Sequence, residues 1–290
     1  MARGSVSRSG YRKVPVAVLP VLALLVAGCG VGRGRLSELV TPGGDPAAAL
    51  ARWQSFPAGA DPRPLVLVSS GVSGPSSGFA TGTGQAPLVA SALDLAVPLP
   101  AAPATAGGYP VVPAERAVAR LRAAVPLDAS TNTPLRIVSA ALAQADFGTD
   151  RGRRRLPAWR FGLDLVREPV WVLAVDAPVL WSHRPDRAYD PGFPATVLPD
   201  GRTVSYDFLG APDDSGSCGV RYSAGATESP SAVVIEVRGV DQGEPLPPGA
   251  VSAACPPGVR RTVTVRLAAP LGGRVLLTAD GAPVMVTAAN

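Results

Sequence analysis

The stretch AWRFGLDLV, residues 158–166, alternates strictly between large apolar side chains and small or polar ones. The alternation assigns one face to the apolar set and the other face to the rest: Trp159, Phe161, Leu163 and Leu165 against Arg160, Gly162 and Asp164. A period of two is typical of a half-buried antiparallel strand, because successive side chains point to opposite faces of a sheet. The sequence therefore predicts an antiparallel sheet that includes this strand.

The neighbouring segments predict a helix packed on that sheet. Apolar residues recur at helical spacing over residues 113–125, with Pro113 in the first turn and Glu115 at the positive end of the helix dipole. Apolar runs predict further strands at 65–68, 88–97, 135–143 and 170–177. We therefore expect residues 65–181 to form an α+β domain, a helix on an antiparallel meander that resembles the cystatin-like and PepSY-like units of secreted proteins.

The last third of the chain predicts an all-β domain. Residues 182–200 are rich in Pro, Asp and Arg and are interpreted as a connector. Six strand candidates follow within residues 201–290, at 203–209, 219–223, 232–238, 262–268, 274–278 and 283–287. The dipeptide Asp280-Gly281 favours a tight hairpin between the last two. The expected fold class is thus α+β followed by a small antiparallel β domain.

Residues 1–28 have the pattern of a secretory signal peptide. A basic start precedes the apolar run 14–27, which Pro15 and Pro20 interrupt. The run is shorter than the roughly 20 residues that a membrane-spanning helix needs. The leader therefore predicts export of the chain rather than a lasting transmembrane helix.

The end of the leader, Val26-Ala27-Gly28-Cys29, resembles the lipobox of bacterial lipoproteins. That resemblance implies that Cys29 becomes an acylated N-terminus, carrying palmitate-like chains, on the extracytoplasmic face of the cell membrane. Two or more fatty chains hold a protein stably in a bilayer. We expect residues 29–64 to be a flexible tether with one short helix near 47–56. The alternative is an ordinary secreted protein whose leader ends in cysteine by chance.

Charge and cysteine content narrow the classes of partner. Four of the 27 basic residues and none of the 22 acidic residues precede Cys29, so the chain after the leader is almost neutral. This charge gives no support for nucleic-acid binding, which needs a basic surface on the folded domain. Once Cys29 is assigned to lipid, Cys218 and Cys255 remain, in a compartment that permits disulfides. We expect these two cysteines to form a bond.

The resemblance to bacterial lipoproteins extends over most of residues 114–286. Four sequence segments carry it: GRRRLPAWRF, SCGVRY, ESPSAVVIEVRG and APLGGRVLLTADGAPV. These segments are similar to segments of uncharacterised secreted lipoproteins of high-GC Gram-positive bacteria. The resemblance implies an extracytoplasmic location and a two-lobed shape, and it brings no known reaction with it.

The common catalytic motifs fit the chain poorly. Residues 74–78, GPSSG, match the G-x-S-x-G pattern around Ser76, but three helix breakers follow where a hydrolase needs a helix. His183 is the only histidine, and the chain after the leader has no lysine for a phosphate loop. One histidine and two cysteines make a poor zinc ligand set. We expect no cofactor and no metal, and a hydrolase is a remote alternative.

Four other groups of residues are candidate sites. Arg151, Arg153, Arg154 and Arg155 form the one basic cluster, a candidate contact for anionic headgroups or wall polymers, with a solvated turn as the alternative. Trp159, Trp171 and Trp181 favour core packing over a ligand groove. The loop acids Asp186, Asp190, Asp213 and Asp214 match no calcium-loop spacing, and nothing in the sequence pairs Asp164 or Asp176 as catalytic carboxylates.

These observations predict a non-enzymatic protein. The favoured function is an envelope binding or interaction module that is anchored to the membrane and contacts another envelope protein or a cell-wall polymer. The alternative is a lipoprotein that binds a small ligand or ion in a cleft between its two lobes.

Overall fold

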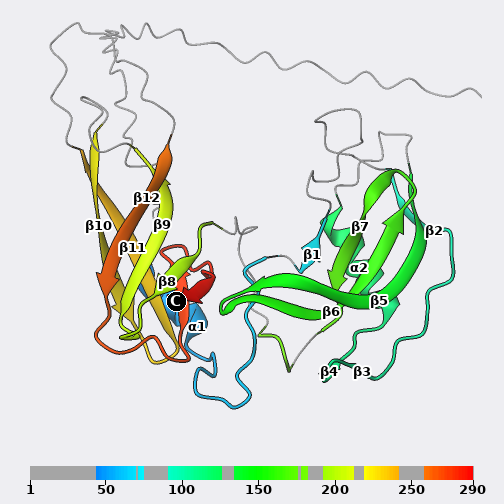
Figure 1. Cartoon of the computed structure of the whole chain (residues 1–290), viewed down its shortest axis with the longest axis horizontal. Coiled ribbons are helices and arrows are strands. Elements are labelled where there is room, and N and C mark those ends of the chain that lie inside the picture. Colours follow the sequence, from blue (N-terminus) through cyan, green and yellow to red (C-terminus); the bar gives the residue numbers. More distant parts are fainter. Residues whose placement is uncertain are drawn as a thin grey trace, which may run out of the picture. The chain divides into compact units, whose positions relative to one another are not determined.

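The computed structural model describes residues 44–69, 71–74, 91–125, 134–175, 178–181, 192–211, 219–241 and 258–289 (Figure 1). Over these ranges the fold is mixed α+β and dominated by strands, with two helices. All of them lie in one compact unit, Arg35–Asn290. No helix among the described residues is long and apolar enough to cross a bilayer. The predicted α+β class is confirmed at this level.

The first lobe, called here the meander lobe, contains a five-stranded sheet in the order β1-β7-β6-β5-β2. Its strands are β1 Val72–Ser73, β2 Leu93–Leu95, β5 Leu135–Thr149, β6 Gly152–Leu163 and β7 Val166–Leu173. Neighbours pair antiparallel except β2 and β5, which are parallel. A small hairpin, β3 Thr105–Ala106 with β4 Tyr109–Pro110, precedes the helix. The predicted order of a helix and then a three-strand meander is confirmed.

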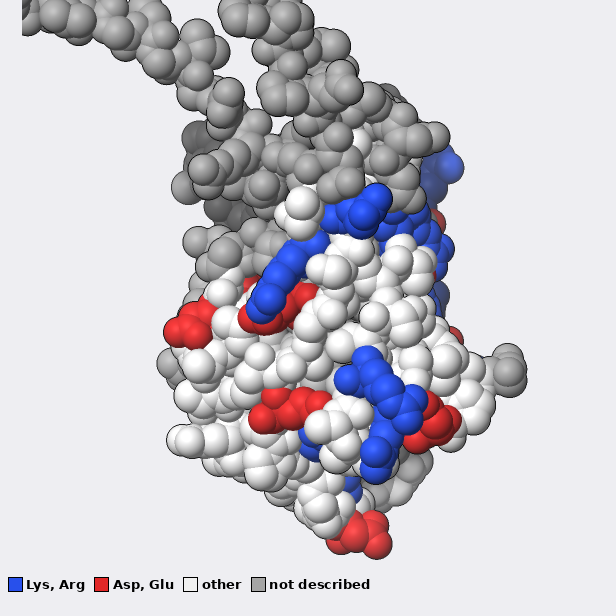
Figure 2. Space-filling model, turned by 90° about the vertical axis from the view of Figure 1, so that its left-hand side faces the viewer, with Lys and Arg blue, Asp and Glu red and all other residues white. Residues whose placement is uncertain are grey.

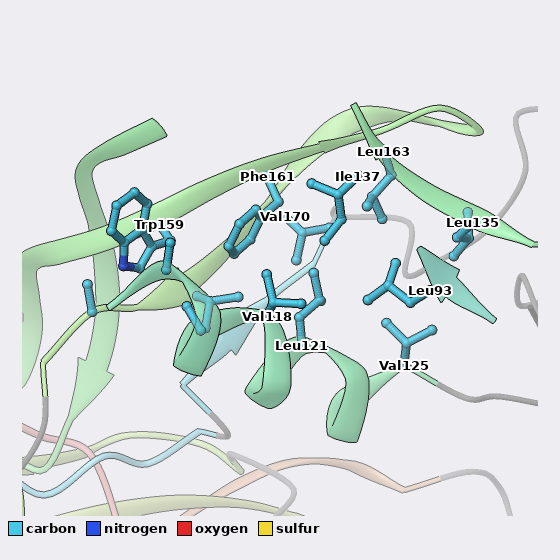
Figure 3. Packing of buried hydrophobic residues seen from close by; sticks show 14 residues of the cluster. Leu93, Val118, Leu121, Val125, Leu135, Ile137, Trp159, Phe161, Leu163 and Val170 are labelled. Atoms are coloured by element: carbon cyan, nitrogen blue, oxygen red, sulfur yellow. The ribbon is translucent and has the colours of Figure 1, made fainter. Parts of the chain in front are cut away.

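Helix α2, Ala114–Ala124, covers one face of this sheet as its spacing predicts. Val118 and Leu121 point from the helix into the sheet, where Trp159 and Phe161 of β6 are buried (Figure 3). The indole nitrogen of Trp159 donates to the carbonyl of Val112 at 2.8 Å, so its one polar atom is satisfied. The helix and the alternating strand thus share one apolar core.

Two details of the predicted sheet were wrong. Leu165 was placed on the buried face, but β6 ends at Leu163, and Leu165 lies in the turn with 43% of its surface exposed. The pairing of β6 with β7 also shifts register between Phe161 and Leu163, which breaks the alternation there. The run 65–68 forms only isolated bridges, at Leu65 and Leu67.

The second lobe, called here the sandwich lobe, consists of two sheets and a helix. One sheet has the order β10-β11-β13 and the other β12-β9-β8-β14. The strands are β8 Ala195–Val197, β9 Thr203–Gly210, β10 Val220–Glu228, β11 Ala232–Asp241, β12 Val259–Arg266, β13 Val275–Thr278 and β14 Val286–Ala288. Apolar residues of both sheets, Val233, Ile235, Val263 and Val265 among them, form the core between them.

The hairpin predicted at Asp280-Gly281 is confirmed over a short span, with Leu277 and Pro283 in an antiparallel bridge across the turn. The tight turn forms, with Gly281 at φ 86° and the amide of Gly281 donating to Thr278 at 2.9 Å. However, β13 pairs parallel with β11, and β14 pairs parallel with β8 in the other sheet. The chain thus crosses between the sheets after this turn, and the lobe is not purely antiparallel.

Part of the predicted tether belongs to the sandwich lobe. Helix α1, Pro46–Trp53, is capped by the side chain of Asp45 and buries Ala49 and Trp53. These side chains pack with Phe56 against apolar residues of β11 and β13, so residues 44–64 are not a free linker. The predicted connector also contains a strand, β8, because Ala195 pairs with β9 and β14.

Candidate functional site

Strands β5 and β6 form a long hairpin, called here the β5–β6 arm, with Asp150 and Arg151 at its tip (Figure 1). The hydroxyl of Thr149 donates to the carbonyl of Gly152 at 2.7 Å and accepts from the amide of Arg151 at 3.2 Å. Gly152 has φ 82°, in the left-handed region that favours glycine. These bonds close a tight turn that carries Asp150 to the sandwich lobe, where the amide of Val286 donates to its carbonyl at 3.3 Å.

The Asp150 carboxylate lies at the centre of a buried polar group, called here the junction cluster, together with Arg63 and Arg151. Its side chain is 1% exposed, and it pairs with the guanidinium of Arg63, which is 15% exposed. Oδ1 of Asp150 also accepts from the amide of Val66 at 3.3 Å. A buried carboxylate with a charged partner and a backbone donor has the contacts that such a group requires.

Arg63 connects the cluster to the sandwich lobe. Its Nε donates to the carbonyl of Gly273 at 2.6 Å, and its guanidinium lies 4.6 Å from the ring centroid of Phe56. Gly273 packs directly against the backbone of Ala58. A Cβ at position 273 would lie only 1.9 Å from the carbonyl oxygen of Ala58. Only glycine at position 273 therefore lets this backbone come close enough for its carbonyl to accept from Arg63.

Arg151, predicted as a contact for anionic surfaces, is bonded into the same junction. Its Nη2 donates to the carbonyls of Gly272 at 2.5 Å and Arg274 at 2.9 Å, and its Nε lies 3.7 Å from Asp150. Burial lowers the pKa of Arg151, while Asp150 opposes that shift. Arg151 thus holds the tip of the arm in place, with 26% of its side chain exposed.

The other three arginines of the predicted cluster remain exposed. Arg153, Arg154 and Arg155 lie within β6 and not in a turn, since the strand begins at Gly152. Arg153 and Arg155 share one face, on which Arg155 stands opposite Asp146 of β5, and Arg154 lies on the other face. The arm therefore presents basic side chains on both of its faces, a geometry suited to an anionic partner.

The three tryptophans do not form one groove. Trp159 is buried beneath α2, and Trp181 packs edge-on against Phe56 in the sandwich lobe, with 5.5 Å between ring centroids. Trp171 lies on the opposite sheet face to Trp159, with the guanidinium of Arg160 5.9 Å from its ring centroid. The preference for core packing is confirmed for Trp159.

Several predicted residues lie outside the described ranges. They are Cys29, Ser76, Asp176, His183, Asp186, Asp190, Asp213, Asp214, Cys218 and Cys255. Of the candidate carboxylates, Asp164 is described, and it is exposed and accepts from the amide of Arg136 at 3.0 Å. Within the described part of the chain, no three His, Cys, Asp or Glu side chains are grouped as metal ligands would be.

The sandwich lobe carries ion pairs on its surface. Glu228 with Arg274 and Glu236 with Arg238 are each separated by 2.7 Å. Figure 2 shows one face of the molecule, on which small groups of acidic and basic side chains are scattered over a largely uncharged surface. The run of three exposed arginines, Arg153, Arg154 and Arg155, lies on the β5–β6 arm.

We expect Asp200 to make stability depend on pH in the acid range. Its carboxylate accepts from the amide of Thr203 at 2.8 Å, from the Thr203 hydroxyl at 2.7 Å and from the amide of Arg202 at 2.9 Å. These bonds lower the pKa of Asp200 from 3.8 to about 2. Because the folded pKa is the lower one, the contribution is complete above pH 3.8 and is lost as the pH falls through about 2.

The Asp200→Asn variant should therefore lose less stability than the parent protein as the pH falls through this window. Thermal melting at a series of pH values would measure the difference, with Asp94→Asn on β2 as an exposed control. Parallel melting curves for Asp200→Asn and the parent over the whole window would contradict the assignment.

No sequence pattern predicts Arg63 and Asp150 as site residues. Arg63 lies in the segment interpreted as a tether, and Asp150 is one acid beside a run of arginines. The two residues are 87 positions apart, and no local pattern indicates that they pair.

Comparison with known proteins found no matching family model, no matching curated protein and no matching solved structure.

Proposed function

We propose that the protein is an extracytoplasmic lipoprotein, anchored to the cell membrane through acylated Cys29, that acts as a non-enzymatic binding module of the envelope. Support for the anchor comes from the leader, in which a basic start, an apolar run and Val26-Ala27-Gly28-Cys29 follow in the required order. Residues 30–43 would then serve as a short tether between the lipid and helix α1.

The observation that carries the binding role is the β5–β6 arm. Its tip is bonded to the sandwich lobe by Asp150 and Arg151, and its exposed arginines lie along β6. A surface that is already fixed loses little conformational entropy when it binds a partner. An arm with basic side chains on a rigid base is suited to an anionic envelope component.

A cleft that closes on a small ligand or ion is the less favoured alternative. Arg63 and Arg151 each donate to carbonyls of residues 272–274 while contacting Asp150. Lobes that are bonded in this way would have to break buried charged contacts to open or close.

Two structural proposals accompany this function. The order of α2 and then β5, β6 and β7 supports a cystatin-like or PepSY-like shape for the meander lobe, to be tested by comparison with an experimental structure. We also propose a Cys218–Cys255 disulfide, which would form after export, since the cell exterior permits oxidation.

The lipid anchor and the binding role can be tested together in intact cells. We expect the parent protein in the membrane fraction and the Cys29→Ser variant largely in the soluble fraction. Chemical crosslinking followed by mass spectrometry should then capture an envelope protein or wall polymer with the parent protein, and much less of it with Cys29→Ser. Membrane retention of Cys29→Ser would contradict the anchor, and crosslinks to no envelope component would contradict the binding role.

A further inference from the structure

Among the described residues, one side of strand β5 has no strand partner over most of its length. It pairs with β6 from Ile137 to Thr149, whereas β2 pairs with it only from Leu135 to Ile137. Near the tip, the amide of Val68 donates to the carbonyl of Gly148 at 3.1 Å. Between these contacts, residues 139–147 have no backbone partner on that side within the described part of the chain.

The backbone groups that point to this free side can be identified. The amide of Ala174, which follows β7, donates to the carbonyl of Pro157 at 2.9 Å, so Pro157 directs its backbone groups toward β7. Its cross-strand partner Gln144 must then direct its own N–H and C=O away from β6. Because the direction alternates along a strand, Ala140, Leu142 and Asp146 expose their backbone groups on the same side.

The sequence explains why the neighbouring chain does not fill this edge. Ala96, just after β2, donates to Ile137 at 3.0 Å, and the segment that follows contains Pro98, Pro100 and Pro103. Proline has no N–H to donate, so this segment cannot continue the ladder.

The edge also lacks the usual protection against pairing. Most exposed edges carry lysine, proline or a short strand that discourages an added strand. Here the side chains at 140, 141, 143 and 145 are all alanine, and Ala141 and Ala143 are exposed. A second strand can therefore approach β5 closely.

The charge of the arm indicates what kind of strand would bind. Its exposed basic residues outnumber its exposed acids: Arg136, Arg153, Arg154, Arg155 and Arg160 against Asp146. Two copies paired through β5 would bring two basic arms together, which disfavours self-association. An acidic segment would be attracted to the same surface.

We propose that the free edge of β5 binds an extended acidic segment of a partner protein as an added antiparallel or parallel strand. The main-chain groups of Ala140, Leu142, Gln144 and Asp146 would supply the hydrogen bonds, and the arginines of β6 would supply the preference for acidic side chains. This inference rests on the proposed binding function and names the site and the class of partner.

The test uses the Cys29→Ser protein and a fluorescent nine-residue peptide of alternating Asp and Val, followed by anisotropy. We expect binding that weakens with salt, and about tenfold weaker binding of the matching Lys–Val peptide. Gln144→Pro removes an outward N–H and should weaken binding about tenfold, whereas Gln144→Ala should match the parent. If Gln144→Pro fails to fold, a peptide N-methylated at alternate residues should show the same loss with the parent protein.

Each other outcome would overturn the inference. Absence of peptide binding, or equal binding by Gln144→Pro and Gln144→Ala, would exclude strand addition at this edge. Binding to phosphatidylglycerol vesicles without binding to the peptide would assign the arginines to lipid, and a dimer that the peptide does not dissociate would assign the edge to a second copy. Capture of an envelope partner in cells alongside any of these results would leave the proposed function intact while this inference fails.

Discussion

Replacing Asp150 by alanine should lower the free energy of unfolding by about 3 to 5 kcal/mol, the usual cost of removing one partner from a buried ion pair. The carboxylate is buried and pairs with Arg63 and, at a longer distance, with Arg151. Its removal would leave two largely buried guanidinium groups without their shared counter-charge. The amide of Val66 would also lose an acceptor.

Chemical denaturation of the Cys29→Ser protein would measure this loss. A matched control is Arg238→Ala, which breaks an ion pair with Glu236 on a side chain that is 70% exposed and should cost under about 1 kcal/mol. Asp150→Asn keeps an acceptor for Val66 and should lie between the parent and the alanine variant. An Asp150→Ala protein as stable as the Arg238→Ala control would show that the junction cluster contributes little to the fold.

The sequence predicted correctly those elements in which the spacing of apolar residues matches the buried face. Helix α2 has apolar residues at helical spacing, and Ala114, Val118 and Leu121 are buried. On β11, the alternation of Val233, Ile235 and Val237 predicted which side chains enter the sandwich core. In each case the pattern is local, so it could be interpreted without knowing the partner element.

The predictions failed where distant contacts decide the structure. Residues 144–157 were expected to connect two strands, but they extend β5 and β6 into the arm, although Arg153, Arg154 and Arg155 give no apolar alternation. The arm is instead fixed at its tip by residues of the sandwich lobe. The parallel pairings of β13 and β14 likewise depend on β11 and β8, which are far away in sequence.

The path of the chain explains why the predicted tether is too long. Helix α1 comes before the meander lobe in sequence but packs on the sandwich lobe through Trp53 and Ala49. The sandwich lobe is therefore built from two separate parts of the chain, and Arg63 lies on the first connection between the lobes. A segment rich in Gly, Pro and Ala does not indicate that it packs on a distant lobe, because its contacts form with residues more than 150 positions away.

Removing the proposed Cys218–Cys255 disulfide should lower the free energy of unfolding by about 3 to 4 kcal/mol, from the chain entropy that a loop of this length restores to the unfolded state. The described strands support the bond. Cys218 precedes β10 by two residues and Cys255 precedes β12 by four, and these strands belong to opposite sheets.

The start of β10 and the start of β12 lie at the same end of the sandwich. Val259 of β12 is paired with Gly210, and the next residue, Ala211, donates its amide to the hydroxyl of Tyr222 on β10 at 2.7 Å. The ring of Tyr222 also contacts Phe208 of β9, with 4.9 Å between centroids. A bond between the two cysteines would therefore join the two sheets at one end of their shared core.

The measurement compares the Cys29→Ser protein with the same protein carrying Cys218→Ala and Cys255→Ala, each denatured with and without reductant. Reduction should destabilise the first by about 3 to 4 kcal/mol and leave the second unchanged, and the two should coincide once both are reduced. The comparison separates the contribution of the disulfide from any packing change caused by the alanine substitutions, because only the disulfide responds to reductant. Two free thiols by mass mapping of the exported protein, or a parent protein insensitive to reductant, would show that the sheets are held by their core alone.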